Sequence, residues 1–170
     1  MAYRNQFDRN GKNSLDGNSA EKLFEQILIK KGYVVRAATF AEQVHDHVDF
    51  FAEKDGKVIT FDVKARKRIS RNDSNPTDEF IWLELRTISG KIGWAMSLVN
   101  FIGFERENDF LVVPTLILQE IIKEKCNLNN VVKTSKEALY SSYTRPSRRD
   151  QLTIIKSSDI LEKSHEIFLK

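Results

Sequence analysis

The spacing of apolar residues predicts a helix in the first part of the chain. Residues 18–31 carry their apolar side chains at intervals of three and four, which places them on one side of a helix. These positions are Ala20, Leu23, Phe24, Ile27 and Leu28. Gly32 then predicts the end of the helix, and residues 33–40 read as a strand.

A β-hairpin is predicted for residues 48–67, VDFFAEKDGKVITFDVKARK. Two apolar runs flank Asp55 and Gly56, a pair that favours a two-residue turn. Counting outward from this turn pairs Asp49 with Asp62. Side chains alternate between the two faces of a strand, so Asp49, Asp62 and Lys64 are predicted to share one face.

The rest of the chain alternates between strand-like and helix-like patterns. Strand patterns cover residues 80–88, 93–105, 110–114 and 151–156, and helix patterns cover residues 114–125 and 157–168. Residues 41–47 and 69–79 read as connections, and residues 135–143 as one or two helical turns. The order predicts an α/β or α+β fold, with a mixed central sheet flanked by helices. We expect a flexible arm over residues 1–16 and a single domain over residues 17–170.

Composition narrows the class of protein. The chain has 170 residues, 41% of them hydrophobic and 30% charged, which suits one globular domain with its own core. It has no apolar run long enough to span a membrane and no signal-peptide pattern. The single cysteine, Cys126, excludes an internal disulfide and a cysteine-based zinc site. These features favour a cytoplasmic protein without a membrane partner.

The distribution of charge says more than the net charge of +3. Residues 64–71, KARKRISR, and residues 140–149, YSSYTRPSRR, are basic and contain no acidic residue. Basic clusters near aromatic residues indicate contact with nucleic acid, although a solvated surface would have the same composition. The candidate nucleic-acid-binding residues are Arg66, Lys67, Arg68, Arg71, Arg145, Arg148 and Arg149.

The two aspartates of the hairpin need a partner. Like charges that face each other on a sheet repel, by about 1 kcal/mol at 4–5 Å in water and by more where solvent is excluded. Mg²⁺ would remove this repulsion, because it binds one or two carboxylates together with water and phosphate; Mn²⁺ is expected to substitute. Lys64 could then orient a water molecule or stabilise negative charge on a phosphate. In the alternative, Asp49 bonds to a loop and Asp62 pairs with Lys64 for structural reasons alone.

Glu21 is a candidate third carboxylate. It lies at the border of the apolar stripe of the first helix, so it could reach over the edge of the sheet. Asn18 and Glu21 also match a capping box at the helix start. The two roles do not exclude each other.

In its order and spacing, this set resembles the PD-(D/E)XK nuclease superfamily. The matching residues are Gly17, Glu21, Gly32-Tyr33 leading to Arg36, Asp49, and Asp62-Val63-Lys64. Within the superfamily, the segment is most similar to archaeal-type Holliday junction resolvases and their phage relatives. The resemblance covers roughly residues 17–68, under a third of the chain. Val48 stands where the motif name has proline, and Thr39 where these resolvases often carry a serine.

The resemblance implies a restriction-endonuclease-like core and a metal-dependent DNA endonuclease that hydrolyses phosphodiester bonds, on branched or structured DNA. Asp49, Asp62 and the backbone carbonyl of Val63 would bind Mg²⁺, Glu21 would bind or position it, and Lys64 would assist the attacking water. A homodimer in a bacterial or phage-infected cell is expected. Two alternatives stay open: a restriction-type, nicking or exonucleolytic member of the superfamily, and a nucleic-acid-binding module without activity.

Other residues are weaker candidates. His45 and His47 could bind zinc as a pair, but no further ligand is evident. Glu84 reads as part of a surface strand, and Trp94 as a core residue.

Overall fold

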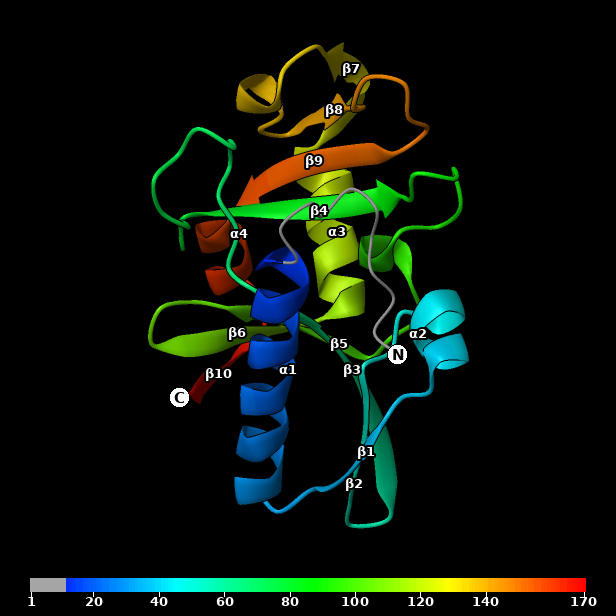
Figure 1. Ribbon diagram of the computed structural model, residues 1–170, viewed down its shortest axis with the longest axis vertical. Coiled ribbons are helices and arrows are strands. Elements are labelled where there is room, and N and C mark those ends of the chain that lie inside the picture. Colours follow the sequence, from blue (N-terminus) through cyan, green and yellow to red (C-terminus); the bar gives the residue numbers. More distant parts are fainter. Residues whose placement is uncertain (1–11) are drawn as a thin grey trace.

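The protein has an α+β fold with two β-sheets, as a computed structural model that describes residues 12–170 shows (Figure 1). The α+β class and a mixed sheet flanked by helices were predicted, whereas a second sheet was not. No helix of the described part of the chain is long and apolar enough to cross a membrane.

The larger sheet has six strands, in the spatial order β1-β2-β3-β5-β6-β10. Only the pair β3–β5 is parallel. The strands are β1 (Val34–Ala37), β2 (Phe50–Lys54), β3 (Lys57–Lys64), β5 (Phe101–Glu105), β6 (Asp109–Pro114) and β10 (Glu166–Leu169).

The smaller sheet has four strands, in the order β4-β9-β8-β7, with β7 and β8 parallel. Its strands are β4 (Phe80–Arg86), β7 (Asn127–Val132), β8 (Ser141–Tyr143) and β9 (Gln151–Lys156). The helices of the described chain are α1 (Lys12–Lys30), α2 (Phe40–Asp46), α3 (Thr115–Lys125), α4 (Ser157–Leu161) and the short 3₁₀ helices η1 (Trp94–Met96) and η2 (Ser135–Glu137).

Helix α1 covers one face of the six-stranded sheet with its predicted apolar stripe. Phe24 is fully buried, and its ring lies 5.1–5.6 Å from the rings of Phe61, Phe110 and Phe168. The helix approaches closely at Gly103 of β5, where a Cβ atom would come within 2.7 Å of the Phe24 ring. Burial of this aromatic cluster fixes the helix on the sheet.

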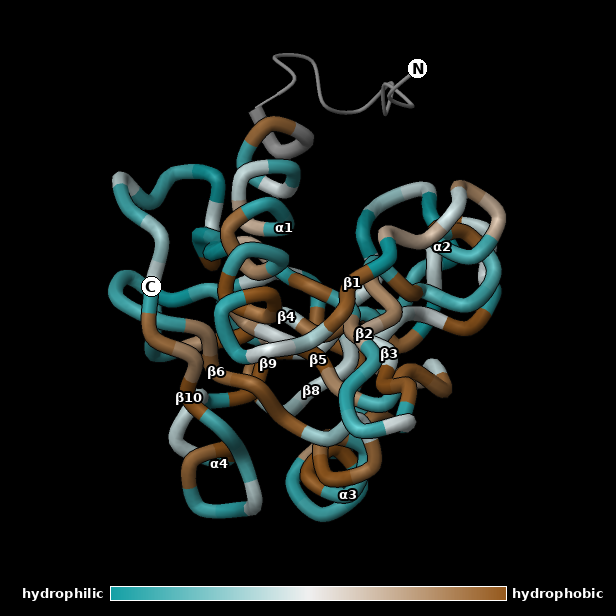
Figure 2. The backbone as a smooth tube through the Cα atoms, turned by 90° about the horizontal axis from the view of Figure 1, so that it is seen from below, coloured by the Kyte–Doolittle hydropathy of each residue, from teal (hydrophilic) through white to brown (hydrophobic). Residues whose placement is uncertain are grey.

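A second hydrophobic core lies on the opposite face of the same sheet. It joins Ile102 and Phe104 of β5 to Leu83 of β4, Leu118 of α3 and Ile155 of β9. Figure 2 shows the hydrophobic segments of the strands gathered between α1 and α3. The central strands β5 and β6 and the last part of β3 are therefore buried on both faces, and a polar side chain at their inner positions is removed from water.

Four of the predicted elements are wrong, wholly or in part. Residues 93–105 contain the 3₁₀ helix η1 followed by strand β5, instead of one strand. Residues 41–47 form most of α2, because Thr39 caps this helix in a capping box with Glu42. Residues 135–143 contain one 3₁₀ turn followed by strand β8, and residues 157–168 contain the short α4 followed by strand β10. Strand β8 has only three residues, and β10 pairs with β6 far away in the sequence, which local periodicity does not report.

The predicted N-terminal arm, residues 1–16, falls mostly outside the described residues. From Lys12 onward the chain is helical, so α1 begins six residues before the predicted start at Asn18. The capping box predicted for Asn18 and Glu21 is therefore wrong, since both residues lie inside the helix.

Candidate functional site

The hairpin of β2 and β3 has the register predicted from its turn. Phe50 pairs with Phe61, and the pairing continues to Lys54 and Lys57 beside the turn. Asp49 lies one residue before β2, at a bend, so the ladder stops just short of the predicted pair of Asp49 and Asp62. The Asp49 N–H donates to the carbonyl oxygen of Phe61, at 2.8 Å. This bond keeps Asp49 at the end of β3.

The carboxylate of Asp49 is held against β3 as well. Its Oδ2 accepts a hydrogen bond from the backbone N–H of Val63, at 2.7 Å. Asp49 therefore meets the strand between Asp62 and Lys64. The metal-ligand role of the Val63 carbonyl stays a prediction.

Asp62 and Lys64 lie on the face of β3 that is turned away from α1. Phe61 and Val63 belong to the core under α1, and side chains alternate along a strand. The β5 partners of Asp62 and Lys64 are Ile102 and Phe104, which belong to the second core. The two charged side chains thus lie between the six-stranded sheet and the elements of the second core.

Asp62 is 1% exposed, and its two oxygens differ in their contacts. Oδ1 accepts a hydrogen bond from the Lys64 ammonium, at 2.6 Å. Oδ2 is buried without a hydrogen-bond partner in the described part of the chain. A buried polar atom left in this way costs free energy, which a bound cation would recover.

The charges of this group shift each other's pKa values. Burial raises the pKa of Asp62 well above its ordinary value; the Lys64 ammonium opposes this effect, and the Asp49 carboxylate adds to it. Burial by itself would lower the pKa of Lys64, but Asp62, Asp49 and Glu84 outweigh it, so that this pKa is raised. Lys64 is accordingly held in its cationic form.

Glu21 of α1 approaches the same group. Burial raises its pKa to about 7, with a further increase from the charge of Asp49 and a decrease from that of Lys64. Helix α1 therefore brings a third carboxylate near the hairpin, as its place at the border of the apolar stripe suggested.

Two further residues surround Lys64 and were not singled out for a site by the sequence. Trp94 of η1 places its ring 5.0 Å from the Lys64 ammonium, a cation–π contact. Glu84 of β4 acts on Lys64 through its charge, and burial raises the pKa of Glu84 itself. A cavity of about 40 Å³ beside Lys64 is lined by Trp94, Trp82 and Lys67 among others, which leaves space for water. Local patterns carry no signal for this grouping, because β4 and η1 meet β3 only in the folded chain.

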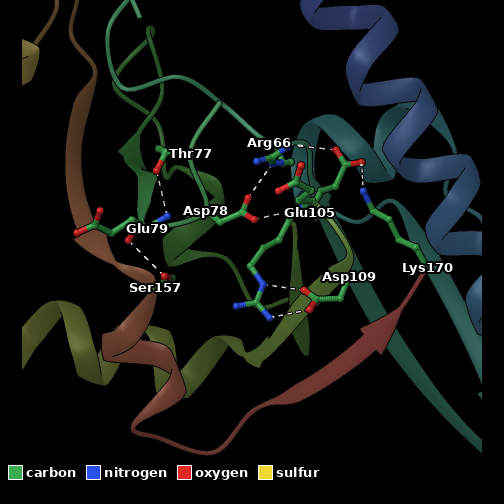
Figure 3. A network of polar contacts seen from close by, with 10 residues as sticks. Arg66, Thr77, Asp78, Glu79, Glu105, Asp109, Ser157 and Lys170 are labelled. Atoms are coloured by element: carbon green, nitrogen blue, oxygen red, sulfur yellow. Dashed lines mark hydrogen bonds and ion pairs between the residues drawn. The ribbon is translucent and has the colours of Figure 1, made fainter. Parts of the chain in front are cut away.

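The basic residues after β3 have different surroundings. Arg66 is bonded to Asp78, at 2.7 Å, within a network of polar contacts that also holds Glu105 and Lys170 (Figure 3). Arg68 donates to the carbonyl oxygen of Asp73. Lys67 and Arg71 are exposed, and their side chains have no hydrogen-bond or ion-pair partner in the described part of the chain.

The second basic segment follows β8. Arg145 contacts Asp150 with its Nε atom, and Asp150 is fully buried. Arg148 is half-buried and Arg149 is exposed beside Gly90. The charge of Arg145 reaches Lys67 and Glu84, so this residue lies near the candidate site.

The weaker candidates have structural roles. Thr39 is the N-cap of α2. His47 ends the same helix in a left-handed conformation, and its Nε2 lies 3.0 Å from the carbonyl oxygen of Ile92. His45 is exposed on α2.

The fit to Mg²⁺ rests on two carboxylates. No three His, Cys, Asp or Glu side chains among the described residues are arranged closely enough to hold a metal together. Mg²⁺ needs only one or two carboxylates when water and phosphate complete its shell. Asp49 and Asp62, with the unpartnered Oδ2, offer two carboxylates, and the charge of Asp49 acts on Glu21 from nearby.

Comparison of the chain with protein-family models, with curated proteins and with solved structures gives no match. The resemblance to PD-(D/E)XK nucleases therefore rests on the residues of the chain and on their arrangement.

Proposed function

We propose that this protein is a Mg²⁺-dependent DNA endonuclease with a restriction-endonuclease-like core, acting on branched or structured DNA. One observation carries the proposal. Asp62 is buried with one oxygen bound to Lys64 and the other unpartnered, beside the carboxylate of Asp49. The ion pair with Lys64 does not satisfy this second oxygen, whereas a cation bound between Asp49 and Asp62 would satisfy it.

Asp49 and Asp62 would hold the metal, together with the Val63 carbonyl, and Glu21 would bind or position it; Mn²⁺ would serve in its place. When bound, Mg²⁺ would supply Lewis-acid activation of the phosphate and of a water molecule. Lys64 would orient that water and stabilise negative charge on the phosphate, because two carboxylates and the Trp94 ring hold its ammonium in place. Hydrolysis would add the water across one phosphorus–oxygen bond of the DNA strand.

Two alternatives differ in what they do with DNA. Another nuclease of the same superfamily, of restriction, nicking or exonuclease type, would use the same residues on another substrate. A binding module without activity would have no use for an unpartnered buried carboxylate, which favours an enzyme. Paired cuts in a branched substrate require two sites, and we therefore propose a homodimer.

Cleavage of DNA of different shapes tests the proposal. We expect Mg²⁺ or Mn²⁺ to support cleavage of a four-way junction in preference to linear duplex or single strands. Asp62→Asn should abolish cleavage, and Lys64→Met should reduce the rate by on the order of 10²–10³-fold. Asp55→Asn, at the exposed hairpin turn, is the matched control and should retain full activity.

The outcomes separate the alternatives. Cleavage of duplex at one sequence would assign a restriction-type enzyme. If no DNA is cut with either metal while DNA binding is intact, the enzyme proposal is wrong and the binding module is favoured.

A further inference from the structure

Lys67 differs from the other basic residues near the candidate site. Lys64 is bound to Asp62 and Arg66 to Asp78, so a carboxylate already neutralises each of them. The Lys67 side chain is exposed, and its ammonium has no partner in the part of the chain that the structure describes. Even so, surrounding protein lowers its pKa, and the charges of Lys64 and Arg145 lower it further. Lys67 also lines the cavity beside Lys64, together with Arg66.

Arg145 is anchored through one nitrogen of its guanidinium. Its Nε contacts the buried Asp150, and its backbone N–H donates to the same carboxylate, at 3.0 Å. Its two terminal nitrogens have no hydrogen-bond partner among the described residues. A guanidinium held along one edge offers its remaining N–H groups to an oxyanion with little loss of entropy.

The packing of the two sheets brings these cations together. Lys67 and Trp82 line the same cavity, and the Trp82 ring lies 6.1 Å from the ring of Tyr143, two residues before Arg145. Tyr143 and Glu84 also flank Leu152 in the smaller sheet. Lys67, which follows the larger sheet, and Arg145, which follows a strand of the smaller one, therefore lie on the same side of β4, near Trp82 and Glu84.

We propose that Lys67 and Arg145 together bind one backbone phosphate of the DNA strand, next to the phosphate that is cleaved. This inference rests on the proposed function, because it assigns the substrate contact of the same site. The cations of Lys67 and Arg145 repel each other in the free protein, and a phosphate between them removes the repulsion. The bound strand then spans from the end of β3 to the end of β8 and touches both sheets.

Glu84 leads to a second expectation, in which a substitution strengthens the binding of DNA. The charges of Lys64, Lys67 and Arg145 act on its carboxylate from nearby, so it offsets part of their repulsion in the absence of DNA. It also repels a phosphate that binds beside it. Neutralising Glu84 should strengthen binding of DNA, whereas neutralising Lys67 or Arg145 should weaken it.

The test is the salt dependence of DNA binding, measured by fluorescence anisotropy with a labelled four-way junction in EDTA, where no cleavage occurs. We expect Lys67→Gln and Arg145→Gln each to weaken binding roughly tenfold. The double variant should lower the slope of log K against log salt by about 1, the value for one phosphate. Glu84→Gln should tighten binding about threefold to tenfold.

Controls address folding and charge. Lys57→Gln, at the exposed hairpin turn, removes one positive charge away from the site and should leave the slope unchanged. Arg145→Gln also removes the contact with Asp150. Arg145→Lys keeps a cation at this position and so separates the loss of charge from a disturbance of the loop. Thermal unfolding of each variant verifies the fold.

Several results would overturn the inference. A fall of about 2 in the slope of the double variant would mean two separate phosphates. Unchanged slopes, or no effect of Glu84→Gln, would mean that no phosphate binds between Lys67 and Arg145, although the protein could still cleave DNA. If the unaltered protein binds no DNA, the proposed function fails as well.

Discussion

Three carboxylates near one lysine define the chemistry at the scale of single residues. Asp62 has little water around it, and the pKa values of Glu21 and Asp62 are raised chiefly by burial. An ionised carboxylate in such a place costs free energy unless a cation compensates it. Lys64 compensates only one oxygen of Asp62. The remaining negative charge lowers the stability of the metal-free protein.

Glu21→Gln tests this cost through pH. The pKa of Glu21 is about 7 in the folded protein and near 4.5 ordinarily. Because the folded state binds this proton more tightly, stability is lost as the pH rises from about 4.5 to about 7. We expect Glu21→Gln to raise the free energy of unfolding at pH 8 in EDTA and to have little effect at pH 4.5, by chemical denaturation. Glu25→Gln, one turn on, controls for the loss of a negative charge on α1. Equal effects of Glu21→Gln at both pH values would contradict the raised pKa.

At the scale of elements, the contact between η1 and β4 sets the position of Trp94. A Cβ atom on Gly93 would lie 2.3 Å from the carbonyl oxygen of Glu84, which only a shift of backbone could relieve. The Gly93 N–H also donates to the carbonyl oxygen of Leu85, at 2.9 Å. Glycine at this position therefore lets η1 lie against β4, where the Trp94 ring meets Lys64.

Gly93→Ala is expected to destabilise the protein by about 1–3 kcal/mol, because the added methyl group overpacks the contact. It should also move Trp94 from Lys64, which tryptophan fluorescence would report. The control is Gly17→Ala in α1, where no atom lies within 4 Å of the new Cβ. That substitution should stabilise the helix by about 0.5–1 kcal/mol. If thermal unfolding finds both variants equally stable, the close approach at Gly93 does not contribute to the stability of the fold.

The whole molecule presents the site between two sheets that both contribute to it. The larger sheet carries Asp49, Asp62 and Lys64, and the smaller sheet carries Glu84 and leads to Arg145. A ligand that binds there contacts both sheets and stabilises the fold as a whole.

Metal binding should therefore raise the melting temperature. At a concentration of Mg²⁺ or Mn²⁺ a hundredfold above Kd, binding contributes about 2.7 kcal/mol. For a chain of this size that corresponds to about 5–10 °C. Asp62→Asn should lose this metal-dependent increase in melting temperature. Asp55→Asn should respond to metal like the unaltered protein. A similar increase in Asp62→Asn would mean that the metal binds elsewhere.

The chain itself determined its local elements and the core of the candidate site. The apolar stripe of α1 and the turn at Asp55 and Gly56 depend on residues near one another in sequence, so periodicity and turn chemistry were enough to predict them. The same turn predicts which residues face Asp62. The register held up to Phe50 and Phe61, one pair short of Asp49 and Asp62.

Only the tertiary structure decided the second sheet and its share of the site. Strand β10 pairs with β6 far along the chain, β8 has only three residues, and β7 pairs with β8 in a shifted register, so local patterns misread or missed them. Glu84, Trp94 and Arg145 lie near Lys64 and Lys67 because β4, η1 and β8 pack there. The unpartnered oxygen of Asp62 also depends on the tertiary structure, since burial is set by the residues that surround a side chain in space and not by its neighbours in sequence.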